Sequence, residues 1–579
     1  MQIYGKLDTV LLRGGILLKL DPKTPSVFFF FGSVIVGILM GAIGSLMASM
    51  FRYGINYIYS QQTVMILGFP FLVSYIAVLS MTALIVAYLR KLASGIPFQG
   101  IADSIYYAHT ATDKTKIKLG FLSTLAAFVS ASGGASVGQY GPLVHFGTII
   151  GVSLKRFFNF GLGLDVFIGA GVAAAISSGF GAPIAGLIFA HEVVLRHYSH
   201  KSIMAIATAS CVSYAFSSMV WKTPQVFDFP ILEFDLFEVV LLSFVSGPIY
   251  AFSAIFYMQV LLQFAKLSQK ISINYIRIIV GIVVLAFIGS FIPEVMGLGT
   301  NTVFDIFSGN FALSSLIIIW LFKIIATAVS LNFGFFGGIF SPAILVGAST
   351  GAIFSSVLYQ LGVTDQMEQI FVICGISAVA GSVLGAPISM IIIVIELTGS
   401  YIYGLSTLVS LAISVSIVQV KFGSSYFDKQ LSTRGIDMSL GRSGIFLREL
   451  SVIELINKDF ICLKLETSVS DAKTLMFEKN TSEAVVTGND DLFIGKLDLV
   501  SLLNGESSRS IKDLVDVNCL TIPCDASVQD AMEIASNFVG EFIPIIDKSK
   551  NKIIGIISES VLFATYLDQQ DGIRSKEKI

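Results

Sequence analysis

Long apolar runs follow one another along the first three quarters of the chain, separated by short polar or glycine-rich connections. Many runs are shorter than the roughly 20 residues that a straight membrane-spanning helix requires, and Gly or Pro interrupts many of them. This pattern predicts broken, tilted helices that pack together within a membrane domain. The runs begin near Val27, Val64, Leu119, Val166, Ile184, Ile203, Val239, Ile279, Leu316, Ile344, Phe371, Ile388 and Leu408.

Two pairs of segments repeat between the halves of this region. The first pair is G-A-P-I-A-G-L-I-F-A-H-E (181–192) and G-A-P-I-S-M-I-I-I-V-I-E (385–396), which share the opening Gly-Ala-Pro and the final Glu. The second pair is G-Q-Y-G-P-L-V-H-F-G-T-I-I-G (138–151) and G-I-F-S-P-A-I-L-V-G-A-S-T-G (338–351), which share three Gly and one Pro at equal spacing. Matches at two linked places indicate an internal repeat.

Composition and charge divide the chain into two domains. Of the 579 residues, 54% are hydrophobic and only 13% are charged, which indicates a polytopic membrane protein. Residues 441–579 nevertheless hold 15 of the 37 Lys and Arg and 22 of the 39 Asp and Glu. We therefore expect an all-α membrane domain at 1–439, with inverted repeat halves at about 26–222 and 236–439, followed by a soluble domain at 440–579.

Neither the N-terminus nor the cysteines indicate secretion. The first 26 residues lack a small-residue cleavage site after a short apolar core, so we expect an amphipathic cytoplasmic lead-in. The five cysteines show no metal-ligand spacing and are expected to be reduced thiols. The sequence has no nucleophile–base pair, phosphate-binding loop or metal cluster, so we expect no enzyme activity, no catalytic or metal-binding residue, no resident cofactor and no nucleic-acid partner.

Three glycine and proline breaks share one chemistry: S-G-I-P (94–97), G-Q-Y-G-P (138–142) and G-I-F-S-P (338–342). Each places Pro where a helix can begin. The first N–H groups of a helix have no acceptor within it and carry partial positive charge. At membrane depth they must face protein or a watery cavity, and together they predict an anion site that binds weakly enough to release the ion. The alternative is that the glycines only permit tight helix packing.

In this order the three breaks resemble the signature segments of the CLC family of chloride channels and chloride/proton exchangers. The resemblance covers nearly the whole chain. It implies an all-helical membrane domain of inverted repeats, a homodimer with one anion pathway per subunit, and a multi-pass protein in the lipid bilayer of the cell membrane with both termini in the cytoplasm. It also implies a site for chloride and similar small anions, formed by the hydroxyl of Ser94, with Gly95 beside it, and by the backbone N–H groups of Ile339 and Phe340.

A tyrosine hydroxyl from the last membrane helix of the family has no direct counterpart. Aligned on Q-L-S-T-R-G (430–435), its position holds Phe427, and Tyr426 precedes it. One residue turns a helical side chain by about 100°. We therefore expect this anion ligand to be lost, with a slip of one residue that brings in Tyr426 as the alternative.

The family's gating glutamate, which usually follows a basic residue, is replaced in this chain. The second break has Gln139 and Tyr140 before Gly141. A tyrosine titrates near pH 10 in water and a glutamate near about 4.3, so at neutral pH Tyr140 is an uncharged hydroxyl. It can donate a hydrogen bond to chloride or obstruct the path, but it cannot compete with the anion as a carboxylate or cycle a proton.

The second proton position of the family's exchangers is also changed. It would directly follow Glu192, where this chain has Val193. Since both carboxylates that an exchanger would use for protons are missing at their expected places, we predict passive chloride conduction by a channel.

Two alternative functions stay open. A chloride/proton exchanger would use a relocated proton path through His145 or His191, and a membrane anchor or sensor would have its activity in the tail. Lys323, inside an apolar run, is expected either to form an ion pair or to raise the potential of the anion path. Glu192 and Glu396 occupy equivalent places in the repeat, so we expect them to have a structural role.

The tail contains a smaller repeat. T-S-V-S-D-A-K-T-L-M (467–476) matches A-S-V-Q-D-A-M-E-I-A (526–535), and β-like runs follow each segment. Tandem strand–helix–strand units of this size resemble a pair of CBS domains, at about 453–508 and 511–570, forming a small α/β module.

The CBS resemblance implies adenine nucleotides as ligands. An Asp would be expected three residues after Ser558, and this chain has Val561 there. That difference argues against nucleotide binding, so we expect the module to act in dimerisation or gating.

Overall fold

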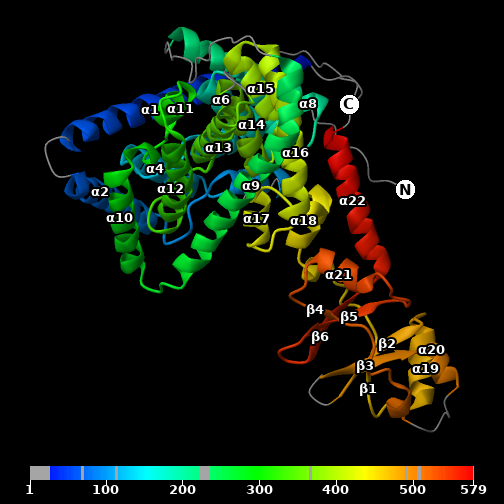
Figure 1. Ribbon diagram of the computed structural model, residues 1–579. Coiled ribbons are helices and arrows are strands. Elements are labelled where there is room, and N and C mark those ends of the chain that lie inside the picture. The colour runs from blue at the N-terminus through cyan, green and yellow to red at the C-terminus, as the bar shows by residue number, and fades with distance from the viewer. Residues whose placement is uncertain are drawn as a thin grey trace. The chain divides into compact units, whose positions relative to one another are not determined.

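The computed structural model describes residues 27–66, 71–110, 115–158, 160–220, 235–363, 368–488, 492–504 and 510–577. The chain divides into two compact units (Figure 1). The first contains the residues up to Ser104 and those from Lys114 to Gly423, and the second contains Ile105–Asp113 and Ser424–Lys578. The division follows Gly423, ahead of the position near 440 that charge density indicates.

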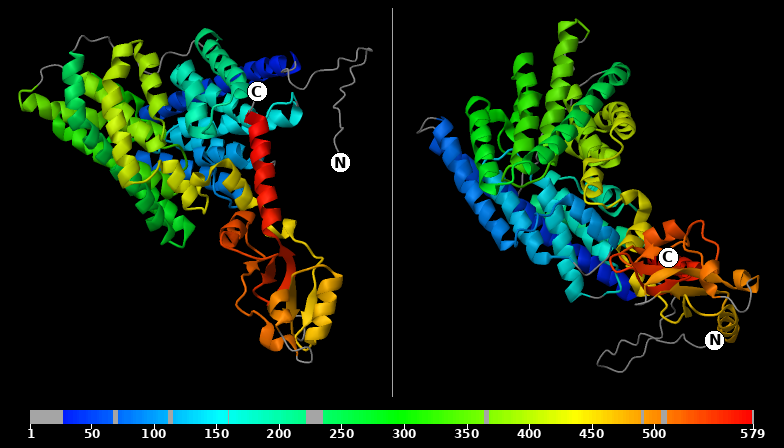
Figure 2. Two further views of the ribbon diagram at one scale, coloured as in Figure 1. Left: turned by 90° about the vertical axis from the view of Figure 1, so that its right-hand side faces the viewer. Right: turned by 90° about the horizontal axis from the view of Figure 1, so that it is seen from below.

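The first unit is built of apolar helices. Among the described residues of the chain, eight helices are long and apolar enough to cross a membrane, and five apolar helices of 10–17 residues are shorter, as the interrupted runs predict. Figure 2 shows these helices tilted against one another rather than aligned. In chain order the helices are α1 (Val27–Ile66), α2 (Phe71–Leu92), α3 (Ile101–Thr110, shared with the second unit), α4 (Ile117–Ser132), α5 (Tyr140–Phe157), α6 (Leu164–Phe180), α7 (Pro183–Phe189), the π-helix η1 (Ala190–Leu195), α8 (His200–Ala215), η2 (Phe216–Val220), α9 (Leu236–Gln269), α10 (Asn274–Phe291), η3 (Pro293–Val295), α11 (Thr300–Phe307), α12 (Leu313–Asn332), α13 (Phe340–Gln360), α14 (Glu368–Leu384), α15 (Pro387–Thr398) and α16 (Tyr401–Lys421).

The second unit contains two copies of one α/β arrangement. In each copy a middle strand pairs parallel with the strand before it and antiparallel with the strand after it. This confirms the expected mostly helical membrane domain followed by a small α/β module. The elements are α17 (Tyr426–Ser432), η4 (Met438–Leu440), α18 (Gly441–Glu449), η5 (Val452–Leu455), β1 (Cys462–Lys464), α19 (Val469–Glu478), β2 (Glu483–Thr487), β3 (Phe493–Asp498), α20 (Leu499–Leu503), η7 (Ile511–Leu514), β4 (Ile522–Pro523), α21 (Val528–Ala535), β5 (Ile543–Asp547), β6 (Lys552–Ile557) and α22 (Glu559–Glu577).

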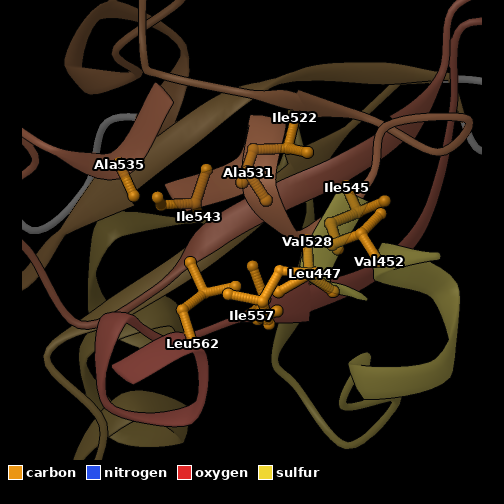
Figure 3. Close-up of a cluster of buried hydrophobic side chains, with 10 residues drawn as sticks. All are labelled: Leu447, Val452, Ile522, Val528, Ala531, Ala535, Ile543, Ile545, Ile557 and Leu562. Atoms are coloured by element: carbon orange, nitrogen blue, oxygen red, sulfur yellow. The ribbon is translucent and has the colours of Figure 1, made fainter. Parts of the chain in front are cut away.

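Each copy has its own apolar core and the same helix start. Aliphatic side chains from α18, α21, α22 and the sheet β4-β5-β6 form the core of the second copy (Figure 3). The hydroxyl of Ser468 accepts from the N–H of Asp471, and Ser527 accepts in the same way from Asp530, both at 3.1 Å. The Ser and Asp that repeat in the tail sequence therefore begin equivalent helices as N-cap and third residue.

Glycines bring α5 onto α6 and α13 onto α14 at equivalent places in the two repeats. A Cβ built on Gly147 would collide with the backbone of Gly171, and one on Gly347 would collide with the backbone of Gly375. Small residues allow such close approach between helices in lipid, where packing and hydrogen bonds replace the hydrophobic effect. The same contact thus holds the centre of each half.

A glutamate of the first repeat binds the start of a helix of the second. The carboxylate of Glu192, in η1, accepts from the N–H groups of Ile388 (2.9 Å) and Ser389 (2.8 Å) and from the Ser389 hydroxyl (2.6 Å). These N–H groups lie in the first turn of α15, where a helix offers no acceptor of its own. Both oxygens of Glu192 are therefore engaged in capping α15.

The reciprocal contact comes from the second repeat. The carboxylate of Glu396, in α15, accepts from the N–H groups of Ile184 and Ala185 in α7, both at 2.8 Å. Negative charge at a helix N-terminus is favourable because the terminus carries partial positive charge. The two glutamates thus cap each other's helices, which is the structural role that their repeated positions predict.

We expect Glu192→Gln and Glu396→Gln each to lower the free energy of unfolding by about 1–3 kcal/mol. A glutamine keeps one acceptor but turns an amide donor toward a backbone N–H, and the charge opposite the helix terminus is lost. The measurement is the apparent melting temperature of the protein in detergent. Asp305→Asn, which changes an exposed carboxylate in α11, is the control. Equal melting temperatures for all three variants would contradict the capping role.

Candidate functional site

The second and third breaks meet in the first unit. The N–H of Gly138 donates to the carbonyl of Gly338 (2.7 Å), and the N–H of Gly338 donates to the carbonyl of Gly138 (2.8 Å), so the two segments pair antiparallel. Two residues later, α5 begins at Tyr140 and α13 begins at Phe340. The N-termini of two helices, one from each repeat, therefore lie at the same place.

Glycines at these breaks allow the two backbones to approach each other. A Cβ built on Gly138 would lie 2.9 Å from the N of Ser341, and one on Gly141 would lie 3.1 Å from the Cα of Gly338. The nearest neighbours of both glycines are thus protein atoms. Tight packing, the alternative interpretation of the glycines, accounts for these two positions, while the helix termini that they bring together remain the candidate anion donors.

The first break lies against the third. The rings of Phe98 and Phe336 are 5.1 Å apart between centroids. Two hydroxyls of α4 hold the two segments, because Ser123 accepts from the N–H of Gln99 (2.9 Å) and Ser130 accepts from the N–H of Phe336 (3.1 Å). These serines lie about two turns apart on one face of α4. The structure thus brings the three breaks of the sequence together.

Ser94 and Gly95 form the end of α2. The N–H of Ser94 donates to the carbonyl of Lys91 (3.0 Å), the N–H of Gly95 donates to the carbonyl of Arg90 (3.1 Å), and Ser94 has a φ of 56°. This is a Schellman turn, whose left-handed residue is usually glycine. Both N–H groups are used inside the turn, so the hydroxyl of Ser94, an exposed residue, is the donor that this turn can offer an anion.

The third break offers backbone donors. Among the described residues, the N–H groups of Ile339 and Phe340 have no protein acceptor. The hydroxyl of Tyr257, in α9, donates to the carbonyl of Ile339 (3.1 Å), which fixes the peptide from the other side. Both N–H groups are therefore available to a small anion.

Tyr140 lies in a cluster of aromatic rings. It is 3% exposed, and its ring is stacked on Phe180, with centroids 3.9 Å apart and planes at 20°. Phe340 is tilted against both rings, at 5.5 Å from Tyr140 and 5.1 Å from Phe180. A Cβ built on Gly179 would lie 3.2 Å from the Tyr140 ring. The aromatic cluster, meaning Tyr140, Phe180 and Phe340, fills the space beside the paired breaks.

Residues one or two positions away from the members of the aromatic cluster have buried polar atoms without a hydrogen-bond partner in the described chain. Within the described part of the chain, Oε1 of Gln139 and the hydroxyls of Ser178 and Ser341 are buried and form no hydrogen bond with protein. Buried polar groups are nearly always satisfied by protein, water or a ligand. Gln139 and Ser341 lie at the starts of α5 and α13 and Ser178 lies in the last turn of α6, which fits a site that holds water or a polar ligand.

The inner-gate position contains no titratable group that is free to move. Val193 is 2% exposed, and Glu192 caps α15 with both oxygens. The two residues lie in η1, and π-helical turns of this kind occur often at functional sites.

The two candidate histidines have different surroundings. His191 is held at both ring nitrogens, by the carbonyl of Leu187 (3.0 Å) and the hydroxyl of Ser202 (3.1 Å). His145, in α5, contacts the hydroxyl of Ser104 through Nδ1 (3.0 Å), and its Nε2 is buried without a partner among the described residues.

Lys323 does not form the ion pair that was one expectation from the sequence. Its fully buried Nζ donates to the carbonyls of Val295 and Gly297, both at 3.0 Å, and no carboxylate contacts it in the described part of the chain. Backbone carbonyls that end a short helix replace the acidic partner, and the sequence carries no signal for such acceptors.

Phe427 and Tyr426 belong to α17 of the second unit. Phe427 is buried and Tyr426 is half-buried, with their ring centroids 6.2 Å apart. The position aligned with the family's tyrosine thus holds a ring without a hydroxyl.

Sequence reasoning missed Phe180 and Arg52. Phe180 ends α6 directly before the G-A-P segment and stacks on Tyr140. Arg52 is a single charge inside the apolar run of α1, and its Nη2 donates to the carbonyl of Gly179 (2.7 Å). A charge within a spanning segment is itself a signal of function, and it would have identified Arg52 as it identified Lys323.

An ion pair within the first copy of the second unit also contacts the second copy. Lys496 Nζ lies 2.7 Å from the carboxylate of Glu483, and both side chains are nearly buried. The same Nζ donates to the carbonyl of Phe542 (3.1 Å) and lies over the ring of Phe538. At the candidate nucleotide loop, the hydroxyl of Ser558 contacts that of Ser560 (2.8 Å).

The comparisons with known proteins agree with this architecture. Residues 77–419 match the family described as voltage gated chloride channel, and residues 511–567 match the CBS domain. An uncharacterized protein of Methanocaldococcus jannaschii is 24% identical over 365 residues, which cover 62% of this chain and 87% of that protein. The H(+)/Cl(-) exchange transporter ClcA of Klebsiella pneumoniae is 25% identical over 408 residues, which cover 66% of this chain and 83% of that protein.

A solved structure extends the likeness to the tail. The crystal structure of a eukaryotic CLC transporter has a TM-score of 0.60 at 16% identity and covers 92% of this chain and 98% of that chain. This likeness concerns the fold. The family match spans more than half of the chain and includes all three breaks, which confirms the resemblance that the breaks indicate. The protein is a membrane protein that belongs to the voltage gated chloride channel (CLC) family and carries a CBS domain in its C-terminal part.

Proposed function

We propose that this protein is a channel that conducts chloride passively, without obligatory coupling to protons. The observation that carries the proposal is Tyr140. The residue that aligns with the gate position of the CLC motif has an aromatic ring, which packs against both Phe180 and Phe340. A phenol remains uncharged near neutral pH, so Tyr140 neither displaces chloride by charge nor releases a proton in each cycle.

The inner position supports the same proposal. The side chain of Val193 cannot titrate, and Glu192 beside it is committed to α15 through three hydrogen bonds. A proton path through the usual places would need a carboxylate at both ends. Tyr140 and Val193 provide one at neither end.

The anion would be held by neutral donors. They are the hydroxyl of Ser94 and the N–H groups of Ile339 and Phe340, whereas Phe427 adds no hydroxyl. Weak, uncharged donors suit chloride and similar small anions, because conduction requires that the ion leave as readily as it enters.

A chloride/proton exchanger is the second candidate. The relative from Klebsiella pneumoniae is named as an exchange transporter, and Nε2 of His145 is buried without a partner in the described chain. A relocated proton path would use His145 before His191, because both nitrogens of His191 already have protein partners.

We also propose the assembly and setting that the family implies. The protein would form a homodimer in the cell membrane with both termini in the cytoplasm. The CBS module would act in dimerisation or gating without adenine nucleotide, since Val561 occupies the place of the expected Asp and Ser558 contacts Ser560.

The reversal potential separates the two candidate functions. In liposomes containing the purified protein, we expect it to follow the chloride gradient alone, and a pH gradient should not shift it. An imposed chloride gradient should not pump protons. Tyr140→Glu should introduce pH dependence: the carboxylate competes with chloride when ionised at higher pH and leaves the path when protonated at lower pH. Proton movement against its gradient in the unmodified protein, at a fixed ratio to chloride, would establish the exchanger instead.

A pair of substitutions separates the ring of Tyr140 from its hydroxyl. Tyr140→Phe keeps the stack on Phe180 and removes only the hydroxyl, so we expect weaker chloride binding with the obstruction retained. Tyr140→Ala removes the obstruction and should raise single-channel conductance, at a cost of about 3–5 kcal/mol in stability. The measurement is conductance in planar bilayers over a range of chloride concentrations. Unchanged behaviour in both variants would remove Tyr140 from the path.

Ser94 is tested by two small residues that both lack its hydroxyl. Ser94→Ala and Ser94→Gly should reduce the permeability of chloride relative to nitrate to the same extent. Only the glycine variant should melt at a higher temperature, because a left-handed φ costs a non-glycine residue about 1 kcal/mol. Proline is a poor probe here, since its φ near −65° would force the turn to rebuild. Unchanged anion permeabilities in both variants would exclude Ser94 from the site.

A further inference from the structure

Arg52 is a charged residue inside an apolar spanning segment. It lies in α1, within the span Phe29–Ser60, and its side chain is half-buried. Charged groups in such segments are costly, and they usually face the protein interior or a watery cavity and mark an ion pathway. We therefore expect Arg52 to have a specific structural or functional role.

The guanidinium of Arg52 reaches the aromatic cluster through the last turn of α6. Its Nη2 donates to the carbonyl of Gly179 (2.7 Å). Gly179 packs against the Tyr140 ring, where a Cβ would lie 3.2 Å from it, and the next residue, Phe180, stacks on that ring at 3.9 Å. The positive charge thus lies beside the last turn of α6, which carries Phe180 of the aromatic cluster.

Within the described residues of the two paired breaks, 138–142 and 338–342, no other side chain carries a positive charge. Gln139 and Tyr140 are neutral, and the buried Lys323 is directed at the carbonyls of Val295 and Gly297. Arg52 comes from a helix far from the breaks in sequence. It supplies a full positive charge at a place where the breaks themselves provide only partial ones.

A capping role is the plain alternative. Cations near a helix C-terminus are favourable, and the bond to Gly179 satisfies a carbonyl in the last turn of α6. That role, however, needs only a hydrogen-bond donor and does not explain the choice of a charged side chain in an apolar span.

We propose that Arg52 is an anion-recruiting residue beside the gate. Its half-buried guanidinium attracts chloride from water and raises the local chloride concentration next to the Tyr140 hydroxyl. Because protein does not cover the residue completely, the guanidinium is not enclosed and can attract the ion without trapping it. The inference rests on the proposed function only in taking Tyr140 to line the anion path.

The test is the chloride concentration that gives half-maximal flux through the full-length protein in liposomes, measured at low ionic strength. Arg52→Gln keeps a donor for Gly179 and removes the charge, and we expect the half-maximal concentration to rise about tenfold. Arg52→Lys keeps the charge and should remain within about twofold of the unmodified protein. Arg277→Gln, which changes a half-buried arginine of α10 whose Nη2 donates to Asn274, is the control and should have no effect.

Two further measurements exclude a merely structural effect. Raising ionic strength with an impermeant salt should shrink the difference between Arg52→Gln and the unmodified protein, because mobile ions screen the charge. The Arg52→Cys variant should regain low-chloride flux with a positively charged thiol reagent and should not regain it with a negatively charged one. The unmodified protein, treated with the same reagents, is the reference.

Two results would overturn the inference. One is an Arg52→Gln variant with the half-maximal concentration of the unmodified protein. The other is equal loss of flux in the Gln and Lys variants together with lower melting temperatures, which would establish capping of α6 as the whole role. Proton coupling does not enter this measurement, so a failure of the passive-channel proposal would be recognised separately by the reversal potential.

Discussion

Every backbone N–H and C=O group at membrane depth needs a partner, and the first unit depends on how its broken helices meet that requirement. Two devices serve it. The backbones of Gly138 and Gly338 satisfy each other directly, and Glu192 and Glu396 reach across the repeats to the starts of α15 and α7. The helix-start donors of the third break are left without a protein acceptor in the described chain. The candidate anion site is therefore made of the groups that the packing of the helices leaves unused.

This origin of the site explains its chemistry. Donors left over at helix starts are neutral amides, and the ring that fills the gate position is neutral as well. Lys323 is fully buried, but its charge is directed at two carbonyls. Arg52 is different, because it is half-buried and its guanidinium donates to the carbonyl of Gly179, the residue directly before Phe180 of the aromatic cluster. A neutral site with one charge at its side binds an anion less tightly than a site that contains the charge.

The sequence predicted the repeated segments and the breaks because the spacing of Gly and Pro is a local pattern. It predicted the two domains because hydrophobicity and charge change along the chain. It also predicted a structural role for Glu192 and Glu396, since a residue repeated in both halves serves what both halves share. It could not predict their partners, because these are backbone N–H groups about 200 residues away, directly after the Gly-Ala-Pro of the other repeat, and the repeated sequence does not show which carboxylate reaches them. The acceptors of Lys323 and the left-handed turn at Ser94 escaped prediction for a related reason. Backbone carbonyls and φ angles depend on tertiary contacts, which hydrophobic periodicity does not record.

The exchanged glutamates have a consequence for the order in which the chain is made. During synthesis, Glu192 emerges from the ribosome long before residues 388 and 389 are made. The start of α7 likewise emerges long before Glu396 is made. During that interval neither element has its native partner, and the carbonyl and N–H of Gly138 also wait for Gly338. The first half of the membrane domain therefore cannot complete its packing while it is being synthesised. Its final assembly in the bilayer begins only after the second half has been inserted, so a translocation machinery or chaperone must tolerate unpaired polar groups in the first half until then.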